Sequence, residues 1–235
     1  MVSRYLNLFM KTFVVVLVTI VAWPFTGYAQ SGPEWIWNPE LSYSKKTSDR
    51  MTLGTKLSIF HSFEDFTEKR ALEYVEQQFT GAYTLTPRWK IGGGYYYRWS
   101  DPLLDGYEYE HRLLQQAGYV SYFGDQRLSH RFRLEQRIRS SSYQNRFRYR
   151  IGFDFPLQGE QLDPGERYLI VKNEMMTAFN GTEADAENRI SLGIGWDLGG
   201  GQKFEINAQH RTLDIFSGDG IGHLLLLNTT YYISR

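Results

Sequence analysis

Alternating apolar and polar residues dominate the middle of this chain. From residue 128 to residue 139, every second side chain is uncharged and mostly apolar, and the side chains between them are mostly arginine. The pattern returns over residues 146–155 after a short polar turn. A period of two predicts β-strands, because successive side chains of a strand point to opposite faces. We therefore expect a hairpin with one apolar face and one guanidinium-rich face.

The orientation of this hairpin separates two classes of protein. In a water-soluble barrel or sandwich the apolar face turns inward, whereas in a transmembrane barrel it meets lipid and the arginines line the interior. Tyr, Phe and Trp make up 16% of the chain, and many lie near predicted strand ends, where membrane barrels carry aromatic girdles. We expect the row containing Phe147 to face lipid and the row containing Arg148 to face a lumen.

Alternating segments recur along the rest of the chain, each followed by a turn. Eleven candidates are found, at residues 35–44, 51–61, 72–84, 89–99, 107–123, 128–139, 146–155, 168–179, 189–198, 203–211 and 223–233. A single-chain bacterial barrel needs an even number if both termini lie on one side of the membrane. The expected fold is an all-β, antiparallel up-and-down transmembrane β-barrel of twelve strands, with one strand undetected. Ten strands is the alternative, if residues 35–44 do not cross.

The first residues indicate export. Arg4 and Lys11 precede an apolar run at residues 13–23, and small residues at 27 and 29 suit a signal peptidase. We predict a Sec-type signal peptide at 1–29, cleaved after Ala29, and a single barrel domain at 30–235. An uncleaved anchor is the alternative, but the run is shorter than the ~20 residues that span a bilayer. No cysteine follows the cleavage point, which excludes a lipoprotein.

Composition removes several kinds of chemistry. The chain has no cysteine, so disulfides, thiol catalysis and zinc–thiolate sites are excluded. Its formal net charge is zero, which gives no electrostatic reason to expect nucleic acid as a partner. The five histidines are scattered and no acidic motif accompanies them, so neither a metal site nor a cofactor is expected.

Four strings resemble a family of uncharacterised bacterial proteins that is catalogued as a domain of unknown function. They are residues 110–116 (EHRLLQQ), 128–137 (LSHRFRLEQR), 145–150 (NRFRYR) and 168–174 (YLIVKNE). The Leu-Glu-Gln-Arg and Phe-Arg-Tyr-Arg strings are the most specific. Members of that family look like exported outer-membrane barrels, so the resemblance implies fold and location but no activity. The end of the chain differs from that of typical outer-membrane barrels, because Ser234 and Arg235 stand where those proteins have a terminal aromatic residue.

The charged residues expected to share the lumen form the candidate site. They are Arg131, Arg133, Glu135, Arg137, Arg146, Arg148, Arg150, Asp154, Glu174 and Glu205. Neighbouring guanidinium groups repel unless carboxylates or water intervene. Such a set either fills a small barrel as a structural polar network or forms an anion-selecting constriction, because rings of arginine favour anions in pores.

Catalysis is not expected. Ser62 follows His61 and Ser129 precedes His130, but residues adjacent on a strand face opposite ways and cannot share a hydrogen bond. We therefore predict a non-enzymatic protein of the Gram-negative outer membrane, with membrane lipid and the barrel-assembly machinery as partners. The alternatives are a narrow, porin-like pore for anions or small solutes, a soluble periplasmic barrel that binds an apolar ligand, and an outer-membrane lipid hydrolase.

Overall fold

The computed structural model describes residues 34–63, 71–104, 107–123, 126–158, 162–181, 184–216 and 220–235. The predicted signal peptide lies outside these residues. Eleven strands are found among them, close to the segments expected from the alternation. They are β1 (Glu34–Lys46), β2 (Met51–Ser62), β3 (Leu72–Thr84), β4 (Trp89–Ser100), β5 (Glu108–Phe123), β6 (Gln126–Arg139), β7 (Tyr143–Pro156), β8 (Arg167–Phe179), β9 (Ala184–Gly199), β10 (Gln202–Leu213) and β11 (Gly222–Ser234).

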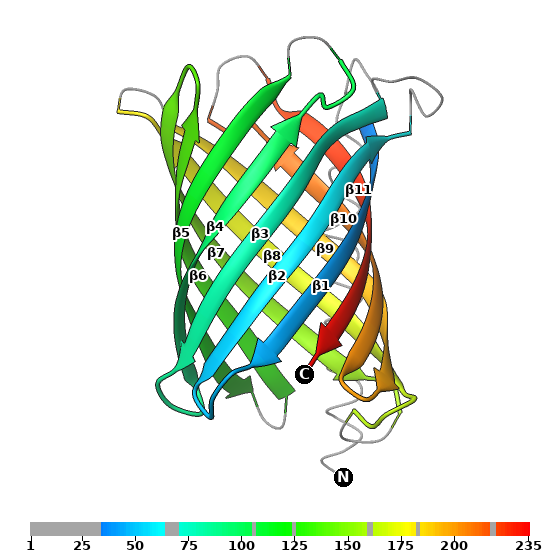
Figure 1. Ribbon diagram of the computed structural model, residues 1–235. Coiled ribbons are helices and arrows are strands. Elements are labelled where there is room, and N and C mark those ends of the chain that lie inside the picture. Colours follow the sequence, from blue (N-terminus) through cyan, green and yellow to red (C-terminus); the bar gives the residue numbers. More distant parts are fainter. Residues whose placement is uncertain are drawn as a thin grey trace. The chain divides into compact units, whose positions relative to one another are not determined.

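These strands close into one barrel of tilted strands (Figure 1). From β1 to β11, each strand pairs antiparallel with the next along the chain. The all-β closed barrel is confirmed. Across the described part of the chain, no helix is long and apolar enough to span a bilayer.

The strand count expected from the sequence was wrong, because β1 and β11 pair in parallel (Figure 1, blue and red). Their register runs without a break from Glu34 opposite Leu224 to Ser44 opposite Ser234. A parallel pair between the first and last strands closes a barrel that has an odd number of strands. Residues 35–44 therefore belong to a full strand of the barrel, and no twelfth strand is required to close it. Consequently β1 begins at the rim opposite to the one where β11 ends. We call these the N-terminal rim and the C-terminal rim.

Inward and outward side chains alternate along each strand. On β7, Phe147 points outward and is 46% exposed, whereas its neighbours Arg146 and Arg148 point inward and are each 8% exposed. On β6, Leu134 is 38% exposed and Glu135 is fully buried. The apolar rows therefore lie on the outside of the barrel, and the buried interior is largely charged.

Two local features shape the interior. A small apolar cluster lies inside the barrel near the N-terminal rim and consists of Ile36, Phe60, Leu224 and Leu226. On β4, a Cβ atom at Gly92 would lie 2.4 Å from the carbonyl oxygen of Gly81 on β3. Only glycine fits this approach of two backbones, which lets the sheet bend here.

Candidate functional site: the charged interior of the barrel

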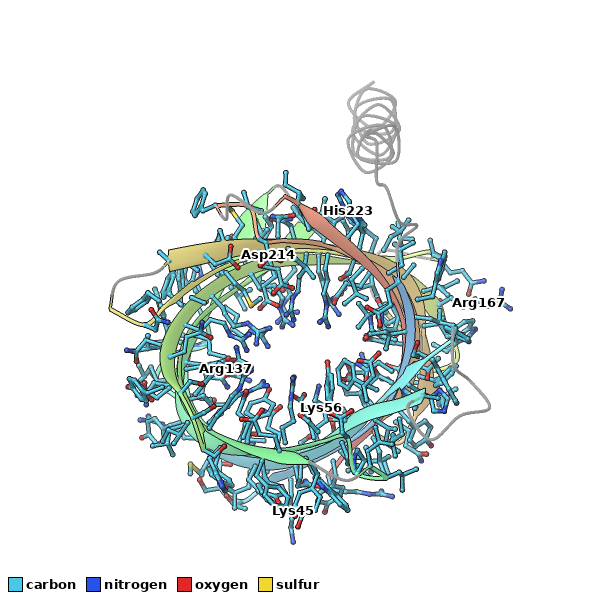
Figure 2. The ribbon with its side chains drawn as sticks, turned by 90° about the horizontal axis from the view of Figure 1, so that it is seen from above. Lys45, Lys56, Arg137, Arg167, Asp214 and His223 are labelled. Carbon is cyan, nitrogen blue, oxygen red and sulfur yellow. The ribbon has the colours of Figure 1, made fainter. Side chains whose placement is uncertain are left out.

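A cavity of about 360 Å³ occupies the interior. Figure 2, a view along the barrel, shows Lys56 and Arg137 pointing into the lumen and Lys45 and Arg167 pointing away from it. Eleven lining residues are basic, namely Lys56, Arg98, Arg112, Arg131, Arg133, Arg146, Arg148, Arg150, Lys172, Arg189 and Arg211. Four are acidic, namely Glu40, Glu76, Glu174 and Glu205. The cavity wall therefore carries a clear excess of positive charge.

Arginines face each other directly across neighbouring strands, which is the most unusual feature of the barrel interior. Four such pairs occur in the register, namely Arg112 with Arg137, Arg133 with Arg148, Arg131 with Arg150, and Arg189 with Arg211. Like charges directly opposite one another destabilise a sheet. Each pair therefore needs a negative group between its members.

Glu135 serves the pair Arg133 and Arg148. Its Oε1 accepts a hydrogen bond from Arg148 Nη1 at 2.8 Å and lies 3.5 Å from Arg133 Nη1. Its Oε2 accepts bonds from Arg146 Nε at 2.9 Å and Arg146 Nη2 at 2.6 Å. Because Glu135 is fully buried, three guanidinium groups hold its charge in place of water.

Glu110 serves the pair Arg112 and Arg137 near the N-terminal rim. Its Oε2 accepts hydrogen bonds from Arg137 Nη2 at 2.7 Å and Arg139 Nε at 2.5 Å. Its Oε1 is bonded to Arg112 and lies 3.0 Å from Arg137 Nε. Arg112 also reaches Glu76 at 3.2 Å. Arg137 is one of the ten predicted lumen residues, and alternation along the chain gives no sign of how these side chains pair.

Glu187 serves the pair Arg189 and Arg211. Its Oε1 accepts a bond from Arg189 Nε at 2.5 Å and lies 4.0 Å from Arg211 Nε. The candidate residues named from the sequence do not include Glu187, Arg189 or Arg211. They lie outside the clear alternation of the central hairpin, and Glu187 precedes the predicted start of its strand.

In the remaining pair, Arg131 and Arg150, Glu174 binds only Arg131. Its Oε1 accepts a bond from Arg131 Nη2 at 2.7 Å, and its Oε2 accepts one from Arg148 Nη2 at 2.7 Å. In the register it faces Arg150 on β7 and Arg189 on β9. One carboxylate thus lies among four guanidinium groups.

The far wall of the cavity carries a smaller set of polar contacts. Glu40 is bonded to Lys56 at 2.5 Å and to the hydroxyls of Ser58 and Thr230 at 3.1 Å each. Tyr96 accepts a hydrogen bond from Arg133 Nη1 at 3.0 Å and lies beneath the guanidinium group. These contacts hold side chains of β1, β2, β4, β6 and β11 in place around the cavity.

Of the ten predicted lumen residues, the structure places seven on the cavity wall. These are Arg131, Arg133, Arg146, Arg148, Arg150, Glu174 and Glu205. Glu205 accepts a bond from the Tyr168 hydroxyl at 2.8 Å and pairs with Lys172 at 3.5 Å. Glu135 and Arg137 do not line the cavity themselves. Glu135 binds Arg148 of the wall, and Arg137 binds Glu110, which in turn is bonded to Arg112 of the wall. Asp154 is the exception, because it lies exposed near the C-terminal rim and joins no ion pair among the described residues.

A serine and a histidine do meet, on the outer surface. Ser121 Oγ on β5 lies 2.8 Å from His130 Nε2 on β6, and His130 Nδ1 lies 2.9 Å from the Tyr149 hydroxyl on β7. Only serines and histidines adjacent in the chain were weighed from the sequence, so this contact between two strands was not predicted. In this part of the sheet β6 is paired on both sides, so its backbone N–H groups are already bonded within the sheet. Among the described residues no group of three or more candidate ligands clusters around a metal position.

A family profile described as a protein of unknown function (DUF2490) matches residues 36–221, which is most of the barrel. The chain belongs to the DUF2490 family. The resemblance drawn from the four strings is confirmed, and the match covers the strands that build the charged interior.

Other comparisons add little to the DUF2490 assignment. One similar solved structure is that of the siderophore receptor PirA from Pseudomonas aeruginosa, with a TM-score of 0.31 and 12% sequence identity. The match covers 77% of this chain and 34% of the receptor chain, so this barrel spans about a third of that protein's length. No curated protein matches the chain.

Proposed function

We propose that this DUF2490 protein is a non-enzymatic outer-membrane β-barrel whose lumen holds and passes small anions. The observation that carries the proposal is the charge of the cavity wall, where eleven basic residues face four acidic ones. Three further carboxylates bind wall arginines: Glu110 binds Arg112, Glu135 binds Arg148 and Glu187 binds Arg189. Basic residues of the wall still outnumber acidic ones when these three are included. Rings of arginine are how pores attract anions.

Membrane placement is supported by the outer surface. Aromatic residues gather at both ends of β4: Trp89 packs on Tyr119 with ring centroids 4.6 Å apart, and Trp99 packs on Tyr109 at 6.4 Å. The two tryptophans lie ten positions apart, about 34 Å at ~3.4 Å per residue. With the strand tilted by roughly 40°, this spans about 26 Å across the membrane, close to the ~25 Å apolar band of such barrels.

An apolar ligand inside a soluble barrel fits the geometry less well. The cavity is bordered by guanidinium, ammonium and carboxylate groups, and burying an apolar molecule there would desolvate them without compensation. Outside, large hydrophobic side chains such as Leu134, Phe147 and Met175 are exposed. A soluble protein rarely leaves so much apolar surface in contact with water.

Reconstitution into liposomes tests the proposal. The protein is expressed, recovered from the outer-membrane fraction and checked for heat-modifiable gel mobility. It is then inserted into vesicles that contain labelled potassium and chloride and are suspended in the same concentration of unlabelled potassium chloride, so that each label leaves by exchange without net transfer of charge. We expect chloride to leave these vesicles faster than vesicles without protein, and potassium to leave more slowly than chloride. Recovery of the protein without detergent would contradict the membrane assignment. Equal or faster potassium release would contradict the anion assignment.

A further inference from the structure

We infer that the lumen contains a specific site for a small, doubly charged oxyanion between Arg131 and Arg150. This inference rests on the proposed function, since the ligand must reach the lumen. It starts from the four opposed arginine pairs, because in three of them one carboxylate contacts both members: Glu110, Glu135 and Glu187. The fourth pair differs.

Arg150 receives no comparable contact. Glu174 faces it in the register, but both carboxylate oxygens are directed to Arg131 and Arg148. Among the described residues, Arg150 has neither an ion pair nor a side-chain hydrogen bond. The Nε atom of Arg131 is buried without a hydrogen-bond partner, as are Arg112 Nη2 and Arg133 Nε in two of the other pairs. What sets this pair apart is that its second member, Arg150, is bound by no carboxylate among the described residues. Two guanidinium groups therefore face each other with donors to spare.

The two arginines border the same cavity, and its volume of about 360 Å³ lies within the ~300–1,000 Å³ range of ligand pockets. Lys172 and Tyr232 also line it. Guanidinium groups donate two parallel hydrogen bonds to carboxylate or phosphate, so a bound oxyanion would occupy the role that a carboxylate fills in the other three pairs. Two facing cations favour a ligand with two negative charges over chloride.

The test is calorimetric titration of the folded, detergent-solubilised protein with sulfate, inorganic phosphate, succinate and chloride. We expect saturable binding of the doubly charged anions and none of chloride in the same concentration range. Comparison of succinate with sulfate and phosphate separates a dicarboxylate ligand from a tetrahedral one. Arg150→Gln should weaken binding by about tenfold or more, since charge-assisted hydrogen bonds are lost.

The matched control is Arg139→Gln, because Arg139 already binds Glu110 and does not line the cavity. This variant should bind sulfate as the unaltered protein does. Arg150→Gln should also unfold at a higher temperature in the gel-mobility assay, because it removes like-charge repulsion with Arg131. If Arg150 had only a structural role, Arg150→Gln would unfold at a lower temperature than the unaltered protein.

Two results would overturn the inference: sulfate binding unchanged in Arg150→Gln, or equal binding of sulfate and chloride to the unaltered protein. Failure of the site is distinguishable from failure of the proposed function. Anion-selective release from liposomes without saturable sulfate binding refutes the site alone. Sulfate binding that depends on Arg150, in a barrel that releases no chloride, refutes passage of anions and leaves the site standing.

Discussion

Arg148 Nη1 donates a hydrogen bond to Glu135 Oε1 at 2.8 Å, and this bond runs diagonally between β6 and β7, because the residue directly opposite Glu135 is Arg146. Arg148 also reaches Glu174 on β8 at 2.7 Å. One arginine thus ties three consecutive strands together through two buried carboxylates. Ion pairs of this kind, in which arginines and carboxylates alternate, hold the interior of the barrel together.

Replacing Glu135 by glutamine should destabilise the barrel strongly. The change keeps the shape of the side chain but leaves the buried guanidinium groups of Arg133, Arg146 and Arg148 without a counter-charge. Breaking a buried ion pair from one side costs about 3–5 kcal/mol. Urea unfolding in detergent, followed by gel mobility, measures the loss. Asp154→Asn is the control and should change little, because Asp154 is exposed. Equal stability of both variants would show that Glu135 does not hold the interior.

A charged residue on the outer surface should block membrane assembly. Phe147→Arg places a guanidinium group in the middle of the outward row of β7, where the cost in lipid is about 2–4 kcal/mol. Less folded protein should be found in the outer-membrane fraction. Phe216→Arg is the control, because Phe216 is 69% exposed and lies between β10 and β11. If both variants assemble as the unaltered protein does, the outer surface does not face lipid.

Cysteines at positions 44 and 234 should form a disulfide across the seam. The Oγ atoms of Ser44 and Ser234 lie 3.1 Å apart, and the chain has no cysteine of its own to interfere. Oxidation of Ser44→Cys/Ser234→Cys should give a faster-migrating band on denaturing gels that disappears on reduction. Ser44→Cys/Thr230→Cys, displaced by four residues in the register, should remain unlinked. Linkage in the second variant instead of the first would refute the parallel seam.

Sequence periodicity predicted the strands well, because the alternation of side chains is a local property. The bounds of β3 match the prediction, and those of the other strands differ by a few residues at either end. Periodicity also identified the row containing Arg148, which points inward. The number of strands was wrong because it rested on an assumption about where the termini lie. The pairing of β1 with β11 joins residues about 190 positions apart, and no local pattern reports it.

The contacts within the site were harder to predict than its composition. Which carboxylate binds which arginine depends on the register between strands. The pairing of Glu110 with Arg112 and Arg137 was therefore not predicted, nor was any role for Glu187. Asp154 follows the same alternation as Arg150 on β7 but lies near the rim, where the side chain is exposed. The contact between Ser121 and His130 was missed for the same reason, since it joins two strands across the outer surface.

The central claim, that lipid surrounds the apolar rows and that the cationic interior admits anions, is tested most directly by the zero-current potential of the purified protein in a planar lipid bilayer. A gradient of potassium chloride is applied, and the sign of the potential reports which ion crosses more readily. We predict a measurable conductance with a potential of the sign set by chloride. A potential of the sign set by potassium, or no conductance from correctly folded protein, would contradict this account.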